Sequence, residues 1–418
     1  MQNNFKRTRI ACYTGYITQA IVVNLAPLLF VIFQDTFDVS LGFIALITLI
    51  TFLVQILIDL AAIKFVEKVT YRFLAVSSQL VSAVGLILLA TLPGIMMPEL
   101  GLLIAVLVYS PGSGLAEVVL SPLVEGLPSD DNLKGSSMTL MHSFYSWGQA
   151  GVILFTTVLL RFIGRSLWWV VPLIWAIIPI YNTLCFLRVP MVEMNTHDES
   201  HGVGGMLKEP IFLIAFILMI CAGASEQAMS QWASMFAERG LGVTKVIGDI
   251  LGPCLFAVMM GLGRTAHGLF GARLNMEKLL FALASFTAVC YFVCVFVPLP
   301  IISLLACGFC GVGVSLMWPG MLVLCAEKFP GGGASMFAML ALGGDIGCSL
   351  GPYIAGTVSD IVMEISSEVR QIENAMVFFD LDTEQLGLRA GFLAAAIFPI
   401  LMCFGVALLR KKGSKVKQ

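Results

Sequence analysis

Long apolar segments alternate with short polar breaks along the whole chain. The apolar runs are about 20 residues long, which is the length that an α-helix needs to cross the hydrocarbon core of a bilayer. Twelve such segments are expected, near residues 9–33, 41–63, 72–94, 100–124, 136–160, 166–188, 210–234, 246–270, 278–298, 300–324, 334–360 and 388–410. The pattern therefore predicts an all-α membrane protein with twelve transmembrane helices.

Composition agrees with a membrane protein. Hydrophobic residues make up 58% of the 418 residues and charged residues 12%, whereas a soluble domain has about 25% charged residues. The net charge of −2 gives no support to nucleic-acid binding. The cysteines are scattered through apolar segments, where they behave as small hydrophobes. Cys307 and Cys310 form a single Cys-x-x-Cys motif without a second ligand pair, so we expect packing rather than a metal or a cofactor.

Basic residues give the orientation. The first apolar run is longer than the roughly 7–15 residues of a cleaved signal peptide, so we interpret it as a retained helix. If the N-terminus is cytoplasmic, inner segments hold about three times as many lysines and arginines as outer ones. The positive-inside rule then predicts a multi-pass protein of the cytoplasmic membrane with both termini in the cytoplasm.

A short motif recurs in the two halves of the chain. Its first copy is Glu125, Pro128, Gly135, Ser137 and Met138, and its second is Glu327, Pro330, Gly333, Ser335 and Met336. Duplicated halves are typical of secondary transporters, whose solute site lies near mid-membrane between the repeats. We predict two pseudo-symmetric six-helix bundles, 1–188 and 208–418, joined by a polar cytoplasmic linker at 189–207.

The loops after the second and eighth spans add a family resemblance. The first keeps an acid, Asp59, and bases that include Arg72, and the second keeps glycines with Arg264 and Arg273. With twelve spans and a long central loop, the chain resembles the major facilitator superfamily, which implies the major facilitator fold and transport by alternating access.

The seventh span narrows the resemblance. Gly223, Ala224, Ser225 and Glu226 are followed by Trp232, which resembles the fucose/hexose–proton symporter branch and implies proton-coupled sugar uptake. In the first span the chain departs from that branch, because Gln19 and Asn24 stand where fucose permeases carry an acid.

Ionisable groups inside apolar helices are functional candidates by default. Glu117 in the fourth span and His142 in the fifth lie about 10 Å from the predicted inner ends of their helices, at 1.5 Å per residue. The short connection between the helices suggests that these side chains meet and exchange a proton. The alternative is that His142 bonds a backbone carbonyl and Glu117 caps a polar cavity.

Polar residues gather on the fourth, fifth and seventh spans. Gly114, Glu117, Ser121 and Glu125 share one face of the fourth span, and His142, Ser146 and Gln149 share one face of the fifth. The candidates for solute binding are Gln19, Asn24, Ser146, Gln149, Glu226, Gln227, Ser230, Trp232 and Trp318. Carboxylates, amides and an indole suit a hydroxyl-rich ligand. The alternative for the seventh span is an outer vestibule wetted by solvent.

Asp345, in the eleventh span, competes with Glu117 for the coupling proton. No lysine or arginine is predicted at mid-membrane depth, so an ion pair there is not expected. Pro319 beside Trp318 predicts a kink in the tenth span. The candidates for an inner gate closed by ion pairs are Asp59, Arg72, Glu125, Arg264, Arg273 and Glu327. A solvated rim is the alternative, because exposed pairs contribute only about 0–1 kcal/mol each.

Several function classes lack motifs here. The sequence has no Gly-x-x-x-x-Gly-Lys-Ser/Thr loop, no His-Glu-x-x-His and no Gly-x-Ser-x-Gly, so neither a nucleotide motor nor an enzyme is expected. We predict a monomeric secondary transporter that moves a small polar solute, with sugar as the leading class and protons as the coupling ion. The alternatives are a drug or metabolite exporter of the same fold and a non-transporting membrane sensor.

Overall fold

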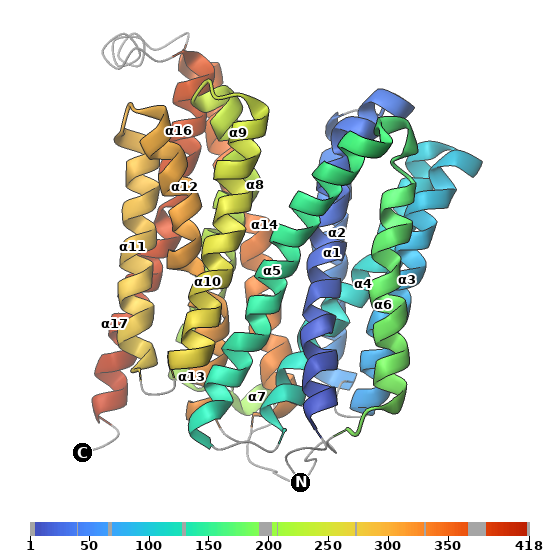
Figure 1. The fold of residues 1–418 in the computed structure, drawn as a ribbon. Coiled ribbons are helices and arrows are strands. Elements are labelled where there is room, and N and C mark those ends of the chain that lie inside the picture. Colours follow the sequence, from blue (N-terminus) through green and yellow to red (C-terminus); the bar gives the residue numbers. More distant parts are fainter. Residues whose placement is uncertain are drawn as a thin grey trace. The chain divides into compact units, whose positions relative to one another are not determined.

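The computed structural model describes residues 5–39, 41–65, 69–127, 131–191, 203–206, 208–271, 274–329, 332–366 and 382–415. Within these ranges every regular element is a helix and none is a strand (Figure 1). The all-α fold class that the apolar pattern predicts is therefore confirmed.

The helices follow the predicted spans closely. The first group is α1 (Lys6–Phe37), α2 (Leu41–Phe65), α3 (Tyr71–Ile95), α4 (Pro98–Glu125), α5 (Asp131–Ile163), α6 (Val170–Arg188) and the short α7 (Val203–Met206). The second group is α8 (Pro210–Met235), α9 (Lys245–Asp249), α10 (Leu255–Phe270), α11 (Met276–Phe296), α12 (Pro300–Val314), α13 (Met317–Lys328), α14 (Gly333–Ser366), α16 (Thr383–Ala395) and α17 (Ile397–Lys415). Among the described residues, 11 segments are long and apolar enough to span a bilayer, and α2 contributes a shorter apolar stretch, Leu49–Ala62.

Contacts divide the chain into two compact units. The first consists of Met1–Met206, His267–Ala272 and Ala326–Leu342, and the second consists of Leu207–Ala266, Arg273–Cys325 and Gly343–Gln418. Most of the predicted linker, residues 192–202 and 207, lies outside the described ranges. The bundle boundaries at 1–188 and 208–418 stay a prediction, because two short stretches of the C-terminal half group with the first unit.

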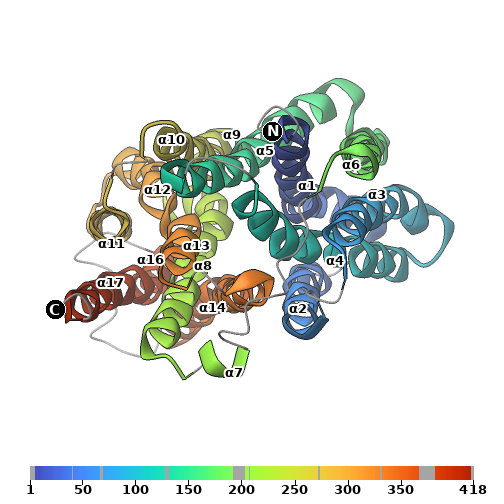
Figure 2. The ribbon, with the colours of Figure 1, turned by 90° about the horizontal axis from the view of Figure 1, so that it is seen from below.

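Within the first unit, α3 packs against α4 and α6, while α1 packs against α5 (Figures 1 and 2). The core is apolar and includes Leu29, Phe33, Tyr109 and Trp168, each at most 5% exposed. Phe33 and Trp168 meet edge to face, with ring centroids 5.1 Å apart. This packing fixes α1, which carries several of the polar candidates.

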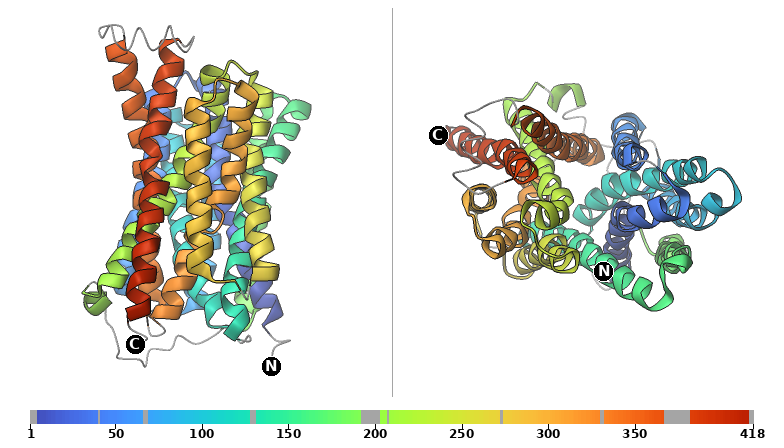
Figure 3. Two further views of the ribbon diagram at one scale, coloured as in Figure 1. Left: turned by 90° about the vertical axis from the view of Figure 1, so that its left-hand side faces the viewer. Right: turned by 90° about the horizontal axis from the view of Figure 1, so that it is seen from above.

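Within the second unit, α11 packs against α12 and α17, and α17 also packs against α8 (Figures 1 and 3). Phe236 and Phe392 meet edge to face with centroids 4.7 Å apart, and Tyr291 lies against the same Phe392 ring. The Tyr291 hydroxyl donates to the carbonyl of Ser225 at 2.8 Å. The aromatic cluster therefore fixes α8 next to the candidate Glu226.

The eighth predicted span is not one continuous α-helix. A π-helical turn, Ile250–Cys254, separates α9 from α10, and it contains Pro253. Proline has no N–H and its ring clashes with the preceding turn, so it favours a local change in the hydrogen-bond pattern. The predicted span at 246–270 is present as the apolar segment Ile247–Phe270, with this π-helical turn inside it.

The tenth predicted span is also broken. α12 ends at Val314 and α13 begins at Met317. Pro319 removes the N–H that would have bonded to the carbonyl of Ser315, four residues earlier. The kink that Pro319 predicts is present, and it lies one turn before the proline.

Two arginines close the ends of long helices. Arg72 donates to the carbonyls of Phe186, Leu187 and Val189 at the end of α6, over 2.8–2.9 Å. Arg389, 6% exposed, donates in the same way to three carbonyls at the end of α11, including that of Val295 at 2.6 Å. The last carbonyls of a helix lack intrahelical donors, and a cation there also interacts favourably with the helix dipole.

Substituting Arg72 with methionine is expected to lower the stability of the protein by about 2 kcal/mol, the scale for hydrogen bonds to a charged group. The measurement is thermal unfolding of the detergent-purified protein. Arg188→Met is the matched control, because Arg188 is an exposed arginine in the last turn of the same α6. Equal stability of the two variants would mean that the Arg72 contacts do not stabilise α6.

Candidate functional site

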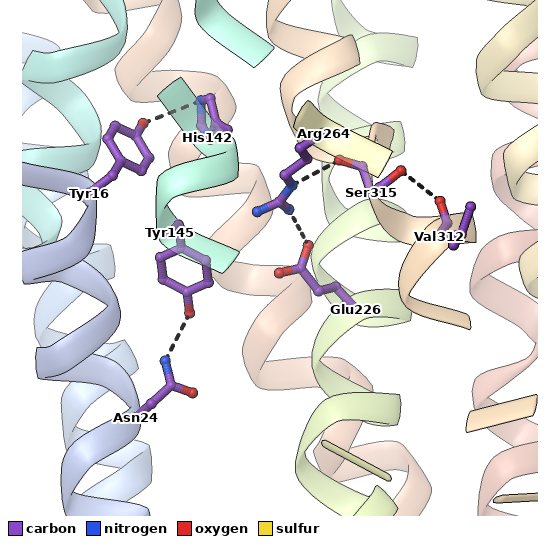
Figure 4. A network of polar contacts seen from close by, with 8 residues as sticks. All are labelled: Tyr16, Asn24, His142, Tyr145, Glu226, Arg264, Val312 and Ser315. Carbon is purple, nitrogen blue, oxygen red and sulfur yellow. Dashed lines mark hydrogen bonds and ion pairs between the residues drawn. The ribbon is translucent and has the colours of Figure 1, made fainter. Parts of the chain in front are cut away.

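A polar cluster joins three helices of the first unit. The Tyr16 hydroxyl of α1 lies 2.9 Å from Ser121 Oγ of α4 and 3.3 Å from His142 Nε2 of α5. Ser121 Oγ and His142 Nε2 are 3.4 Å apart, which closes a triangle. Figure 4 shows Tyr16 pointing from α1 toward the imidazole of His142. All three side chains are buried.

The carboxylate of Glu117 lies one helical turn before Ser121. Gln19 Nε2 of α1 donates to Glu117 Oε2 at 2.9 Å, and both side chains are buried. The sequence led us to expect that Glu117 and His142 meet each other. The structure links each of them to α1, Glu117 through Gln19 and His142 through Tyr16, and a direct contact between the two stays a prediction.

A further contact joins α1 to α5. Asn24 Nδ2 donates to its own helix, at the carbonyl of Ala20, and lies 3.5 Å from the Tyr145 hydroxyl (Figure 4). Both side chains are half-buried. Farther along the predicted stripe of α5, Ser146 and Gln149 are 0% and 4% exposed. The polar stripes of α4 and α5 therefore face protein rather than lipid.

The helical spacing explains why these side chains converge. Tyr16 and Gln19 are three residues apart on α1, and Glu117 and Ser121 are four apart on α4, so each pair shares a face. A cluster of carboxylate, amide, phenol, hydroxyl and imidazole groups can hydrogen-bond a hydroxylated solute and can hold or pass a proton.

Tyr16→Phe is expected to destabilise the protein by about 1 kcal/mol, because Ser121 and His142 each lose a buried hydrogen-bonding partner. The apolar contact of the ring with His142 would remain. The control is Tyr13→Phe, one turn earlier on α1, whose half-buried ring stacks on Phe144 with centroids 4.6 Å apart. The measurement is thermal unfolding of both variants. A larger loss of stability for Tyr13→Phe than for Tyr16→Phe would contradict the stabilising role of the Tyr16 hydroxyl.

The second unit contains a buried ion pair. Arg264 Nη2 of α10 lies 3.0 Å from Glu226 Oε2 of α8. Arg264 Nε also donates to the carbonyl of Ser315 at 2.8 Å, and Ser315 Oγ donates to the carbonyl of Val312 at 2.6 Å (Figure 4). Arg264 is 2% exposed and Glu226 is 8% exposed. The expectation that no basic side chain reaches a buried acid is therefore wrong for Glu226.

The remaining candidates of α8 differ in exposure. Gln227, Ser230 and Trp232 are half-buried, and the Trp232 indole donates to the carbonyl of Pro352 at 3.2 Å. Solvent wetting, the alternative for this span, does not describe the buried Glu226.

Trp318 packs against Gly344, the residue before Asp345, in the second unit. Trp318 is 8% exposed and Asp345 is 2% exposed. A Cβ added to Gly344 would overlap the Trp318 ring, so the indole packs directly on the backbone beside Asp345. The glycine therefore permits Trp318 to pack closely on the backbone of α14, at the residue that precedes Asp345.

The gate candidates lie in different environments. Asp59 and Arg264 are buried, Arg72 and Glu125 are half-buried, and Glu327 is exposed. Arg273 lies outside the described residues. A solvated rim, the alternative to a gate, does not fit Asp59 or Arg264. Arg72 bonds the end of α6, a structural contact that the sequence did not indicate.

Sequence reasoning missed several buried polar residues. Tyr16, Tyr145 and Ser315 were not singled out, although Tyr16 shares a helical face with Gln19. A second cluster was also missed, in which Asn182 Nδ2 donates to Gln79 Oε1 at 3.1 Å and to the carbonyl of Ala11 at 3.0 Å. This cluster ties α1, α3 and α6 together and is consistent with a structural role.

No metal site is evident in the described part of the chain, where no three His, Cys, Asp or Glu side chains are grouped so that they could hold an ion. Cys294 Sγ and Cys307 Sγ are 3.4 Å apart, between α11 and α12, and both are buried.

Comparison with known proteins now places the chain in a family. The sequence profile of the Major Facilitator Superfamily matches residues 12–352. The chain belongs to this superfamily and is a multi-pass membrane transporter. No match was found among curated proteins.

Solved structures agree on the fold. FucP, a Major Facilitator Superfamily transporter in the outward conformation, has a TM-score of 0.74 at 16% identity, with 96% of this chain and 99% of that chain covered. A second structure, of the E. coli fucose:proton symporter FucP, gives 0.73 at 15% identity over 96% and 99%. The proton:xylose symporter XylE bound to 6-bromo-6-deoxy-D-glucose gives 0.72 at 12% identity over 98% and 96%.

Proposed function

We propose that this transporter moves a small polar solute, with sugar as the leading class, together with protons. The observation that carries the proposal is the buried hydrogen-bonded cluster of the first unit, where Gln19 bonds Glu117 and Tyr16 joins Ser121 to His142. Buried ionisable groups in membrane helices are costly and mark solute or proton pathways. FucP and XylE, which share the fold, are named as sugar:proton symporters.

Glu117 is proposed as the leading carrier of the coupling proton. Glu117 is buried and accepts a hydrogen bond from the Gln19 amide, so it is suited to take up and release a proton as solute binds. His142 and Asp345 are the other candidates. Glu226 is paired with the guanidinium of Arg264 at 3.0 Å, and a carboxylate has further lone pairs with which to accept hydrogen bonds. We therefore propose that Glu226 binds solute hydroxyls as an acceptor.

The remaining assignments follow the sequence. We propose that Gln19, Asn24, Ser146, Gln149, Gln227, Ser230, Trp232 and Trp318 bind solute. Asp59, Glu125, Arg264, Arg273 and Glu327 are proposed for the inner gate. The protein is proposed to act as a monomer in the cytoplasmic membrane with both termini in the cytoplasm, as the basic residues indicate.

The test uses the purified protein in liposomes that contain a pH-sensitive dye. L-Fucose, D-xylose, other hexoses, deoxyhexoses, amino sugars and organic acids are added outside, one at a time. Acidification of the lumen that depends on a sugar supports the proposal. Exchange of a labelled sugar without acidification would contradict proton coupling. Transport of apolar cations or drugs alone would favour an exporter of the same fold.

A further inference from the structure

The break in the tenth span leaves a backbone carbonyl that its own helix does not satisfy. Pro319 has no N–H to bond the carbonyl of Ser315. The helical ladder resumes with the next pair, since Gly320 N donates to the carbonyl of Leu316 at 2.8 Å. Inside a membrane bundle no bulk water is present to satisfy such a carbonyl, so a donor from another helix stabilises the break.

That donor is Arg264. Its Nε donates to the carbonyl of Ser315 at 2.8 Å, and the arginine is 2% exposed. The preceding residue explains how α10 comes so close. A Cβ added to Gly263 would lie 2.5 Å from Ser315 Oγ and 2.7 Å from Ser315 Cβ. The glycine therefore lets the backbone of α10 lie directly against the break.

The same guanidinium holds Glu226. Its Nη2 lies 3.0 Å from Glu226 Oε2, so one rigid cation bonds a carboxylate of α8 and a carbonyl of the tenth span at once. A guanidinium presents several donors in a fixed plane, whereas an ammonium is a single point on a flexible stem. Lysine at this position can therefore not reproduce both contacts with the same geometry.

The break also carries a candidate solute residue. Trp318 lies three residues beyond Ser315, and its ring packs on the backbone of Gly344 beside Asp345. The orientation of the Trp318 indole consequently depends on the conformation of the break. Glu226 and Trp318 are thus both held through Arg264, although they lie on different helices.

We propose that Arg264 is a positioning residue of the transport site, which fixes the Glu226 carboxylate and the break at Ser315 with one guanidinium. The inference rests on the proposed function in one respect, that Glu226 and Trp318 bind the solute. It adds a role that neither the repeat nor an ion-pair gate at the inner ends of the spans gives to Arg264. Loss of the second contact is predicted to disturb solute binding even where the charge at position 264 is kept.

The first experiment needs no solute. Arg264→Lys keeps the positive charge beside Glu226 but loses the planar set of donors that bonds Glu226 and Ser315 at once. This variant is expected to lower the melting temperature by about 4 °C. Pro319→Ala restores an N–H for the carbonyl of Ser315, so in that background Arg264→Lys should lower the melting temperature by about half as much or less. Pro179→Ala, in α6 of the first unit, is the control background, where the full loss is expected.

The second experiment measures uptake of L-fucose and D-xylose into liposomes. Arg264→Lys is expected to raise KM about tenfold with Vmax within about twofold, the pattern of weakened binding. The double variant with Pro319→Ala should recover part of the KM. The proposal would be overturned if Arg264→Lys lowered the melting temperature equally in the wild-type and the Pro319→Ala backgrounds. It would also be overturned if the two substitutions were coupled in melting temperature but the KM of Arg264→Lys were unchanged. If wild type transports neither sugar, the proposed function fails for sugars, and the melting-temperature cycle alone decides for or against the contact.

Discussion

Replacing Glu117 with glutamine is expected to abolish uphill transport while leaving solute exchange in place. A proton gradient of one pH unit is worth about 1.4 kcal/mol and sustains about tenfold accumulation of a solute that moves with one proton. A glutamine side chain cannot release a proton, so the variant should only equilibrate the solute across the membrane. The amide keeps the shape of the side chain, and its oxygen can still accept the hydrogen bond that Gln19 donates to Glu117.

The measurement is accumulation of labelled L-fucose or D-xylose in proteoliposomes with an imposed gradient of about one pH unit. Counterflow of the same sugar, with no gradient, reports whether the variant still binds and moves it. Glu99→Gln is the matched control, since Glu99 is an exposed carboxylate in the first turn of the same α4. Accumulation that survives in Glu117→Gln would transfer the coupling role to Asp345 or His142.

The apolar pattern was sufficient to predict the helices, because every backbone group in a bilayer has to be satisfied inside its own segment. What it could not predict was where the segments depart from a regular α-helix. Hydropathy does not report hydrogen-bond pairing, so it gave no sign of the π-helical turn Ile250–Cys254 inside the span 246–270. Pro253 carried the signal that was missed there, whereas Pro319 did predict the kink in 300–324. The carbonyl that Pro319 leaves without an intrahelical donor, that of Ser315, lies a full turn earlier.

The candidate site was predicted in part. Helical spacing identified buried faces correctly for α4 and α5, because residues three and four apart share a side of a helix. It did not identify partners on other helices, since these depend on how helices pack. Tyr16 and Gln19 of α1 were therefore not foreseen as the hydrogen-bond partners of His142 and Glu117.

Arg264 shows the limit most clearly. Its position six residues before the end of a predicted helix suggested a rim residue, but the long side chain is buried and reaches Glu226. An arginine can extend its charged group well away from its own backbone position. The position of Arg264 in the predicted span therefore indicated the depth of its backbone in the membrane, but not the depth of its guanidinium.

The ion pair leads to the second large effect. Arg264→Gln alone is expected to destabilise the protein by about 3–5 kcal/mol, because it leaves the carboxylate of Glu226 buried without its cation. Glu226→Gln alone should cost a similar amount for the converse reason. The double variant Glu226→Gln/Arg264→Gln removes both charges and should be markedly more stable than Arg264→Gln. It should still fall short of wild type, because the Ser315 carbonyl loses its Nε donor.

Thermal unfolding and size-exclusion profiles of the four detergent-purified proteins test this expectation as a double-mutant cycle. Arg239→Gln is the control, since Arg239 is an exposed arginine just beyond α8 in the same unit. If Arg264→Gln is as stable as Arg239→Gln, the pair is not a buried, charge-compensated contact. If the double variant loses as much as the two single losses combined, the side chains act independently. A pair whose two charges compensate each other is supported only if the double variant regains stability relative to Arg264→Gln.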